Sequence, residues 1–322
     1  MLNRRQFAAG AATLLAAPAR AQSFPSKPVK ILVPFAAGGN TDIIARLVGK
    51  QLSEMFREQF VVENRPGANG AIAAEAVAKA PKDGYTLFMA ALPQIAIFPA
   101  MTKVNYDPVA DFAPVSNVGF NPFVLAASSK LAPVKTLAEF VAHARNSKSN
   151  LSYGSGGVGS LGHLSMILLG KKGGFVVRHL PYRGGGPAVN DAVAGHIDMI
   201  IGSAALLAAQ IEAGALRPLL QTGAQSLKNL GETQTAKEAG FADFEASAWW
   251  GIFATGGTPR PVRDRMLAEL NATFRDPQVA KVLVDTQQIN LLLQGPDEFG
   301  KFFAEQMNVW GAVVRDNDIK PD

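Results

Sequence analysis

Glycine-rich turns between a short apolar strand and a helix are the feature that most constrains how this chain folds. The first unit covers residues 30–47 (KILVPFAAGGNTDIIARL), and the same order returns at residues 151–170 and 179–195. A short apolar run bounded by turn residues predicts a buried strand of a parallel sheet. Strands and helices also alternate over residues 59–91, which favours crossover connections. We therefore predict an α/β fold of mostly parallel sheets with helices on both faces.

The glycine turn of the first unit has the composition of an anion site. Gly38 and Gly39 let the backbone approach a ligand closely, and Asn40 or Thr41 can cap the helix that follows. The free amides of the first helical turn then point back at the loop, where a small negatively charged group is stabilised. A plain structural turn has the same local pattern. The repetition of the unit is what favours several amide-lined loops that converge on one ligand.

The second unit contains the glycines of a G-x-G-x-x-G motif at residues 157–162. Between a strand and a helix this motif is the fingerprint of dinucleotide sites, which also place an acidic residue about 20 positions further along. Here that region carries Arg178 and Arg183. We therefore expect no nucleotide and no other cofactor. The loop is interpreted as a cradle for a carboxylate, to which Ser155 and Ser160 add hydroxyl groups.

The third unit places a cation beside a flexible turn. Tyr182 and Arg183 precede three consecutive glycines, of which Gly184 is the first. A guanidinium can hold a carboxylate with two parallel hydrogen bonds. An arginine that faces solvent fits the same residues, so both interpretations stay open at this point.

Composition excludes several classes of site. The chain of 322 residues has no cysteine, which rules out disulfides, thiolate metal ligands and cysteine nucleophiles. Its four histidines are scattered without metal-ligand spacing, so no metal site is expected. Without residues 1–21 the formal net charge falls from +5 to +2, because three arginines are lost and no acid. No long basic run remains, and no nucleic-acid partner is expected.

The first 21 residues have the pattern of a cleavable signal peptide. Two arginines precede an apolar stretch at residues 7–17, and Ala-Arg-Ala at 19–21 fits an A-x-A cleavage site, so the mature chain should begin near Gln22. The apolar stretch is too short to cross a bilayer, which takes about 20 residues. The RRQF segment resembles a twin-arginine signal, and a general secretory route fits as well. We expect an exported, periplasmic protein that is soluble and acts as a monomer.

Two apolar runs far apart in the chain are predicted to connect two lobes. The first, residues 122–128, follows a Pro- and Asp-rich stretch at 106–118 that is interpreted as a connection, and the second is residues 246–254. Two crossing strands form a hinge whose opening changes a cleft. The late amphipathic helices at 258–274 and 296–316 are expected to pack on the first lobe. The predicted division is 1–21 signal peptide, 22–124 first part of lobe 1, 125–246 lobe 2 and 247–322 return to lobe 1.

A secreted serine hydrolase is the rival to a binding protein. It would use Ser155 or Ser160 with His163 and an acid. The G-x-S-x-G elbow of such enzymes is missing, because Tyr153 and Val158 occupy the positions of its first glycine. His163, one helical turn after Ser160, more simply caps or packs. We therefore expect no catalytic residue and no enzymatic activity.

Several segments, read in order, resemble one known family. PFAAGGNTDIIARLVG, ENRPGANGAIAAEAVAKAPKDGYTLFM, YDPVADFAPVS, YGSGGVGSLGHL, PYRGGGPAVNDAVAGHID and the late GIFATGGTP are similar to the extracytoplasmic solute-binding proteins of tripartite tricarboxylate transporters, the Bug family. The resemblance runs from about Phe24 to the C-terminus. It implies a two-lobe fold like that of type II periplasmic binding proteins, which captures a small carboxylate in the cleft and delivers it to integral membrane transporter subunits. A binding protein that reports to a membrane sensor is the alternative, because both roles need the same closed form.

The same resemblance implies which loops hold the carboxylate. They are residues 35–42 and 155–157, with Asp42 expected to support the helix start and not to touch a like-charged ligand. Many relatives have an acidic or amide residue where this chain has Gly202 and Ser203, and residues 91–93 make that part of the cleft look apolar. With the residues singled out above, the predicted ligand-binding set is Phe35, Ala36, Gly38, Gly39, Asn40, Thr41, Asp42, Ala91, Ser155, Gly156, Gly157, Ser160, Tyr182, Arg183, Gly184 and Ser203.

Overall fold

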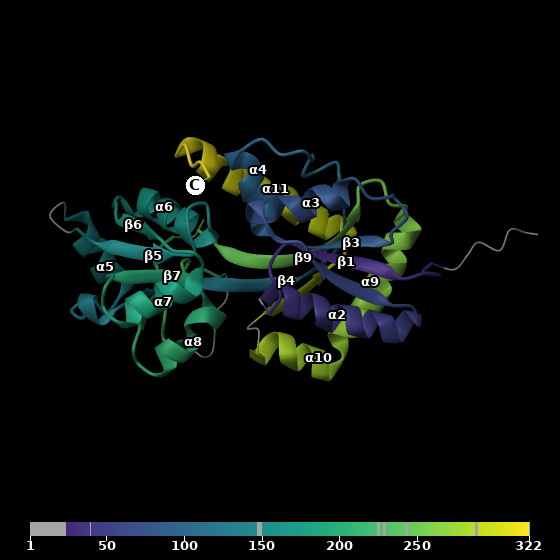
Figure 1. Cartoon of the computed structure of the whole chain (residues 1–322). Coiled ribbons are helices and arrows are strands. Elements are labelled where there is room, and N and C mark those ends of the chain that lie inside the picture. Colours follow the sequence, from purple (N-terminus) through teal and green to yellow (C-terminus); the bar gives the residue numbers. More distant parts are fainter. Residues whose placement is uncertain are drawn as a thin grey trace, which may run out of the picture.

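The structure is a computed structural model that describes residues 24–38, 40–146, 150–223, 226–227, 230–241, 244–286 and 289–321. The predicted signal peptide, residues 1–21, and Gly39 lie outside the described residues. Two α/β bodies lie side by side and are connected by the long strands β4 and β9 (Figure 1). No helix of the described part is long and apolar enough to span a membrane.

Three parallel strands form the outer part of the sheet in the first body. They are β1 (Val29–Val33), β2 (Phe60–Asn64) and β3 (Thr86–Ala91), in the order β2-β1-β3. β1 is buried except at Lys30, as expected for an apolar strand with helices on both faces. The next strand inward is β9 (Ser247–Thr255), which runs antiparallel to β3. The expected α/β fold with parallel strand pairs is thus confirmed, with the crossing strands running antiparallel to them.

Strand β4 (Phe112–Ala127) belongs to both bodies. Its residues 112–122 pair with β9, and its residues 123–127 pair with β7 (Met199–Ser203) and β8 (Arg217–Gln221). The interpretation of residues 106–118 as a connection is therefore wrong from Phe112 onward. Pro114 suggested a loop, but it is accommodated where the pairing with β9 shifts register between Pro114 and Ser116. A short strand, β10 (Asn290–Gln294), pairs with β4 as well.

The second body repeats the parallel arrangement. β5 (Ser152–Ser155) lies between β7 and β6 (Arg178–Pro181) and is parallel to both. Helices α5 (Leu137–Arg145), α6 (Leu161–Gly173), α7 (Gly185–Val193) and α8 (Ala204–Glu212) complete it. The predicted boundaries at 124/125 and 246/247 fall within β4 and immediately before β9. We keep them as a proposed division into lobes.

Helices cover both faces of the first body's sheet. Residues of β3 alternate between two hydrophobic clusters: Phe88 joins one with Phe303 and Trp310, and Met89 joins the other with Ile44. The first layer contains α3, α4 and α11, and the second contains α2 and α10 (Figure 1). The bounds are α2 Asn40–Phe56, α3 Ala71–Ala78, α4 Phe98–Met101, α9 Arg260–Arg275, α10 Pro277–Lys281 and α11 Pro296–Asp316, with short turns η2 Ala68–Gly70, η3 Pro93–Ile97, η4 Ser129–Leu131 and η6 Val282–Thr286.

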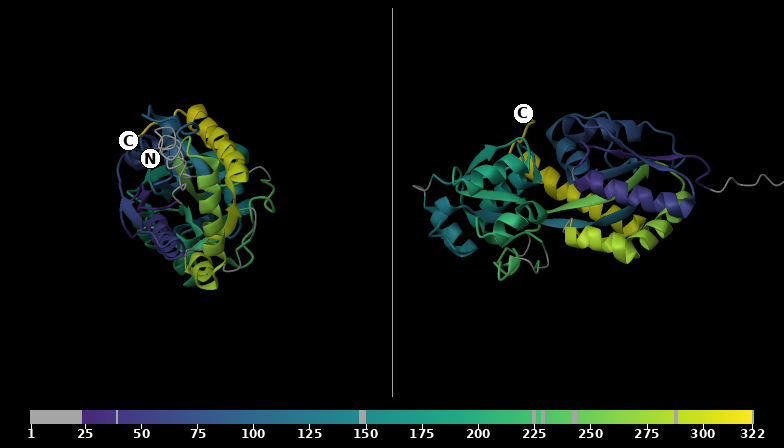
Figure 2. Two further views of the ribbon diagram at one scale, coloured as in Figure 1. Left: turned by 90° about the vertical axis from the view of Figure 1, so that its right-hand side faces the viewer. Right: turned by 60° about the horizontal axis from the view of Figure 1, so that its bottom comes forward.

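Helix α11 reaches both bodies. It packs against η3 and α4 of the first body, and its C-terminal part contacts α6 of the second (Figure 2). Lys171 Nζ lies 3.6 Å from Asp316 Oδ2 across this contact. The expectation that the helix at 296–316 packs on the first lobe is therefore incomplete, because its 21 residues are long enough to extend past the crossing strands.

Candidate ligand-binding site

The loops predicted to bind a ligand lie at the carboxyl ends of parallel strands. In the first body the predicted loop is residues 34–38 after β1, and residues 65–70, after the parallel strand β2, lie at the same edge of the sheet. In the second body they are residues 156–160 after β5, residues 182–184 after β6, and Ser203 at the end of β7. Ligands of open α/β sheets bind outside these strand ends, where the amides of the following helices are free.

Loops from the two bodies share one crevice. A cavity of about 170 Å³ is lined from the first body by Phe35, Asn69, Pro93, Ile97, Phe98 and Met101, and from the second by Gly156, Val158, Gly159 and Ser160. Phe35 of the first glycine-turn loop and residues 156–160 of the second thus lie on one cavity, whereas Gly38 is not among its lining residues.

A second cavity of about 150 Å³ continues into the second body. Gly156 and Ser160 line both cavities, so the two spaces adjoin at this loop. The remaining lining residues are mostly small or apolar: Phe123, Ser155, Gly162, Gly185, Ala188, Ile200, Ile201, Gly202, Ser203 and Leu206. None of the lining residues of either cavity carries a formal charge. A bound anion would thus be held by amides, hydroxyls and helix N-termini.

Asp42 fixes the shape of the first loop. The residue is 3 % exposed, and its carboxylate accepts hydrogen bonds from Gly38 N (2.9 Å), Arg46 Nε (3.0 Å) and Asn64 Nδ2 (2.9 Å). Asn64 Nδ2 also donates to Phe35 O at 3.0 Å. Burial alone would raise the pKa of Asp42, but the hydrogen bonds from Arg46, Gly38 and Asn64 hold it below its ordinary value. The structure thus agrees with a supporting role for Asp42 at the start of α2.

Two further residues of the first loop are already engaged. The amide of Gly38 is used by Asp42, so it is not free for a ligand in this arrangement. Thr41 lies inside α2 and its Oγ1 accepts from Trp250 Nε1 at 3.0 Å, so the alternative in which Thr41 caps the helix is wrong. Asn40 begins α2, and its side chain is outside what the structure describes.

Ser155 organises the second loop. The residue is 1 % exposed, and its Oγ lies 2.7 Å from His179 Nε2, 3.1 Å from Ser160 Oγ and 3.2 Å from Gly157 N. Gly157 has a φ of 123°, a conformation that L side chains rarely adopt. Ser160 also caps α6 by accepting from His163 N at 3.3 Å. The two serines therefore hold the loop as well as lining the cavity.

A pair of stacked histidines lies behind this loop. The rings of His163 and His179 are 4.0 Å apart and nearly parallel, and Tyr153 stacks on the other side of His179 at 4.9 Å. Burial, together with the nearby His163, lowers the pKa of His179 to about 4, so the ring is neutral at ordinary pH. The hydrolase interpretation paired a serine with His163, whereas Ser155 bonds His179. Among the described residues no carboxylate is hydrogen-bonded to His179, so the third member of a triad is missing.

The third loop, residues 182–184, supports the loop at residues 156–160 and lines neither cavity. Tyr182 N donates to Ser155 O at 3.2 Å, and Tyr182 Oη donates to Asp191 Oδ2 at 2.6 Å. Burial and Asp191 raise the pKa of Tyr182 to about 12. Gly184 has a φ of 105° and leads into α7. Arg183 is exposed and lines neither cavity, which favours the solvent-facing alternative in this arrangement.

The predicted residues other than Gly39 and Asn40 thus fall into three groups. Five line the cavities: Phe35, Ser155, Gly156, Ser160 and Ser203. Others shape the loops: Gly38, Thr41, Asp42, Gly157, Tyr182 and Gly184. Ala36 and Arg183 are exposed, and Ala91 is buried with its amide bonded to Gln94 Oε1 at 3.1 Å, so none of these three lines a cavity.

Sequence reasoning missed much of the apolar wall. Ile97, Phe98 and Met101 follow β3 and line the shared cavity, yet an apolar run of this kind fits a protein core equally well. Asn69 also lines the shared cavity; it is exposed in a left-handed conformation with a φ of 50° and makes no hydrogen bond to another described residue. His179 carried no local signal, because its contact with Ser155 depends on β6 lying beside β5.

Two α/β bodies joined by crossing strands, with amide-rich loops around a shared crevice, define a solute-binding protein of the periplasmic class. A family model described as the tripartite tricarboxylate transporter family receptor matches residues 44–319. The chain belongs to this receptor family, whose members are periplasmic.

Individual relatives agree with this assignment. Protein BugT of Bordetella pertussis is 30 % identical over 311 residues, which cover 95 % of this chain and 94 % of BugT. A solved structure of an R. palustris protein with adipate is 31 % identical, covers 93 % of this chain and 100 % of its own, and superposes with a TM-score of 0.79. MatC from Rhodopseudomonas palustris with bound malate is 29 % identical, covers 90 % and 100 %, and has a TM-score of 0.73.

Proposed function

We propose that this protein captures a small carboxylate in the crevice between its two bodies and delivers it to the integral membrane subunits of a tripartite tricarboxylate-type transporter. The observation that carries the proposal is the cavity shared by Phe35 and Asn69 of the first body and Gly156 and Ser160 of the second. Binding needs no catalytic residue, and the ligand leaves chemically unchanged.

The carboxylate is held mainly by backbone amides and by the N-termini of helices. Ser160 and Ser203 cap α6 and α8, and both line the cavities, so two helix starts face the same space. Asn69 adds a side-chain amide from the opposite body. Each charge-assisted hydrogen bond contributes about 1.5–3 kcal/mol net. Four or five of them, less the cost of ordering, reach the roughly −8 kcal/mol of a micromolar complex.

The rest of the ligand is expected to be apolar. Six of the ten residues around the shared cavity have apolar side chains: Phe35, Pro93, Ile97, Phe98, Met101 and Val158. No charged side chain lines this cavity, so a second carboxylate of a diacid would also have to be bound by amides or hydroxyls. Adipate, found in one relative, has a four-carbon apolar chain, whereas malate, found in another, has a hydroxyl group on a short one. Carboxylates with an apolar chain therefore fit this crevice better than compact hydroxy acids.

Closure of the two lobes is what tells the membrane partner that a ligand is bound. We take residues 22–124 and 247–322 as one lobe and 125–246 as the other, with β4 and β9 as the hinge. A ligand that contacts both lobes stabilises the closed form, and a membrane partner can distinguish the two states. A membrane sensor in place of a transporter would recognise the same closed form.

A thermal unfolding screen of the exported protein tests the proposal. At about 100 times its dissociation constant, a ligand adds about 2.7 kcal/mol to the free energy of unfolding. We expect stabilisation by aliphatic or aromatic carboxylates, less by malate, and none by nucleotides. Asn69→Ala should weaken that stabilisation, whereas Asn105→Ala, at an exposed amide that pairs with Glu75, should not. Hydrolysis of an ester panel that Ser155→Ala abolishes, with no carboxylate bound, would support the hydrolase instead.

A further inference from the structure

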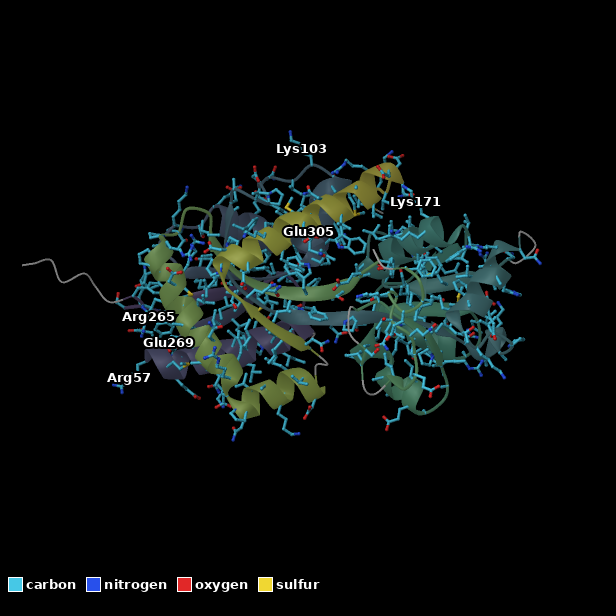
Figure 3. The ribbon with its side chains drawn as sticks, turned by 180° about the vertical axis from the view of Figure 1, so that it is seen from behind. Arg57, Lys103, Lys171, Arg265, Glu269 and Glu305 are labelled. Carbon is cyan, nitrogen blue, oxygen red and sulfur yellow. The ribbon has the colours of Figure 1, made fainter. Side chains whose placement is uncertain are left out.

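A separate cavity of about 270 Å³ lies where α11 and β10 cover the crossing strands. We call it the hinge cavity, and its lining residues are Phe120, Glu245, Ser247, Leu292, Gln294, Phe302 and Gln306. It shares no residue with the two cavities of the candidate site. Phe120 belongs to β4 and Ser247 is the first residue of β9, so the hinge cavity touches both strands that connect the bodies. Figure 3 shows this side of the molecule, with α11 running across it and Glu305 labelled.

The hinge cavity and the candidate site lie on opposite faces of β4. Phe120 and Phe123 are three residues apart in a regularly paired part of this strand, so their side chains project to opposite faces. Phe120 lines the hinge cavity and Phe123 lines the second cavity of the candidate site. A molecule bound in the hinge cavity would therefore contact the strand that also forms a wall of the carboxylate site.

Polar groups of the hinge cavity lack partners. Ser247 is 9 % exposed, and its Oγ has no hydrogen-bond partner among the described residues. Gln306 Oε1 accepts from Trp310 Nε1 at 3.0 Å, and Gln294 Oε1 accepts from Asn117 Nδ2 at 3.0 Å. In each glutamine the side-chain oxygen is therefore engaged, and the amino group remains available as a hydrogen-bond donor. A ligand carbonyl oxygen would accept from these amino groups and from Ser247 Oγ, and of the three donors the Ser247 hydroxyl is the buried one that is costly to leave unbonded.

Charge at the hinge cavity is negative. Glu245 lines it, and although the residue as a whole is exposed, enough protein surrounds its carboxyl group to raise its pKa. The nearby Glu305 of α11 raises that pKa further by like-charge repulsion. A cation bound at Glu245 would relieve this repulsion. Phe120, Leu292 and Phe302 supply an apolar wall for the rest of the ligand.

We propose that the hinge cavity is a second ligand site, which takes a small amphipathic cation. Its ammonium group pairs with Glu245, a carbonyl oxygen accepts from Ser247 and the glutamine amides, and an apolar chain lies against Phe120 and Phe302. The cation differs in charge from the carboxylate of the proposed function, and the inference does not depend on that function.

Calorimetric titration of the protein with L-leucinamide tests this site. The probe carries an ammonium group, a carbonyl oxygen and an apolar chain, and has no carboxylate for the candidate site. 4-Methylpentanamide is the matched control without the ammonium group. We expect L-leucinamide to bind and the neutral amide to bind about fivefold or more weakly, because it loses an ion pair of about 1 kcal/mol. Absence of binding, or equal affinity of the two probes, would overturn the proposal.

Variants locate the binding. Glu245→Gln and Ser247→Val should each weaken L-leucinamide binding about fivefold, by loss of an ion pair and of a hydrogen bond. Glu212→Gln, at an exposed acid of α8, and Ser160→Ala, in the candidate site, should leave it unchanged. Unaltered circular dichroism would show that the variants fold. Binding that persists in both hinge variants, or that disappears in Ser160→Ala, would refute the hinge site, whereas failure of the carboxylate screen alone would not.

Discussion

Trp250 Nε1 donates a hydrogen bond to Thr41 Oγ1 at 3.0 Å, across 209 positions of the chain. Both residues are buried, and Trp250 lies on the crossing strand β9 while Thr41 lies in the first turn of α2. The neighbouring Trp249 faces the other way and packs against Phe302 of α11, because side chains alternate along a strand. One crossing strand therefore contacts the start of α2 with one face and α11 with the other.

Trp250→Phe should lower both stability and ligand affinity. The substitution leaves Thr41 Oγ1 buried without its partner, which costs about 1–3 kcal/mol in the free energy of unfolding. Because Thr41 follows the loop at residues 35–38, we also expect weaker carboxylate binding by calorimetry. Trp310→Phe is the control: it removes a partly buried indole hydrogen bond, to Gln306 at 3.0 Å on α11, that does not involve the loop at residues 35–38. Equal losses of carboxylate affinity in the two variants would contradict a specific role for Thr41.

Asp42→Asn should destabilise the protein by about 2 kcal/mol, because the neutral amide weakens the charge-assisted bonds from Arg46 and Gly38. The lowered pKa of Asp42 gives the effect a pH dependence. Its contribution is fully present above the ordinary value of 3.8 and is lost as pH falls from there through the lowered pKa. Urea unfolding at several pH values should show the two proteins converging in acid. Asp264→Asn, in an exposed ion pair with Arg260, should change stability by less than about 1 kcal/mol.

His179 should make stability fall between pH 6.5 and 4. Its pKa is lowered to about 4 in the folded protein, against 6.5 ordinarily, so over this window the unfolded chain binds a proton that the folded one does not. The loss should be about 2 kcal/mol once the partial exposure of the ring is taken into account. The groups around the ring are Ser155, Tyr153 and His163. His179→Gln should flatten the unfolding free energy over this range, whereas replacement of the exposed His143 by Gln should leave the slope in place.

Features that depend on neighbouring residues in the sequence could be predicted, whereas contacts between segments far apart in the sequence could not. The strand, turn and helix around Asp42 are determined by neighbours within the segment, and both the unit and the supporting role of Asp42 were predicted. The contact of Thr41 with Trp250 and that of Ser155 with His179 join segments that only the sheet order brings together. Arg183 was compatible with two orientations, and no local pattern distinguishes them. The apolar wall at residues 97–101 was ambiguous because core and cleft residues have the same composition.

Gly157→Ala should weaken carboxylate binding and also lower the stability of the folded protein. Gly157 has a φ of 123°, and a Cβ built there would lie 3.1 Å from Tyr182 O. The backbone strain is of the order of 1–3 kcal/mol, and the loop can relieve it only by moving the neighbouring Gly156 and Ser160, which line both cavities. We therefore expect a loss of affinity of about tenfold by calorimetry, together with a loss of stability no larger than that strain. Gly186→Ala is the matched control, since a Cβ there meets no atom within 4 Å and its φ is unstrained. If the Gly186 variant lost as much affinity as the Gly157 variant, the carboxylate would not be bound by the loop that follows β5.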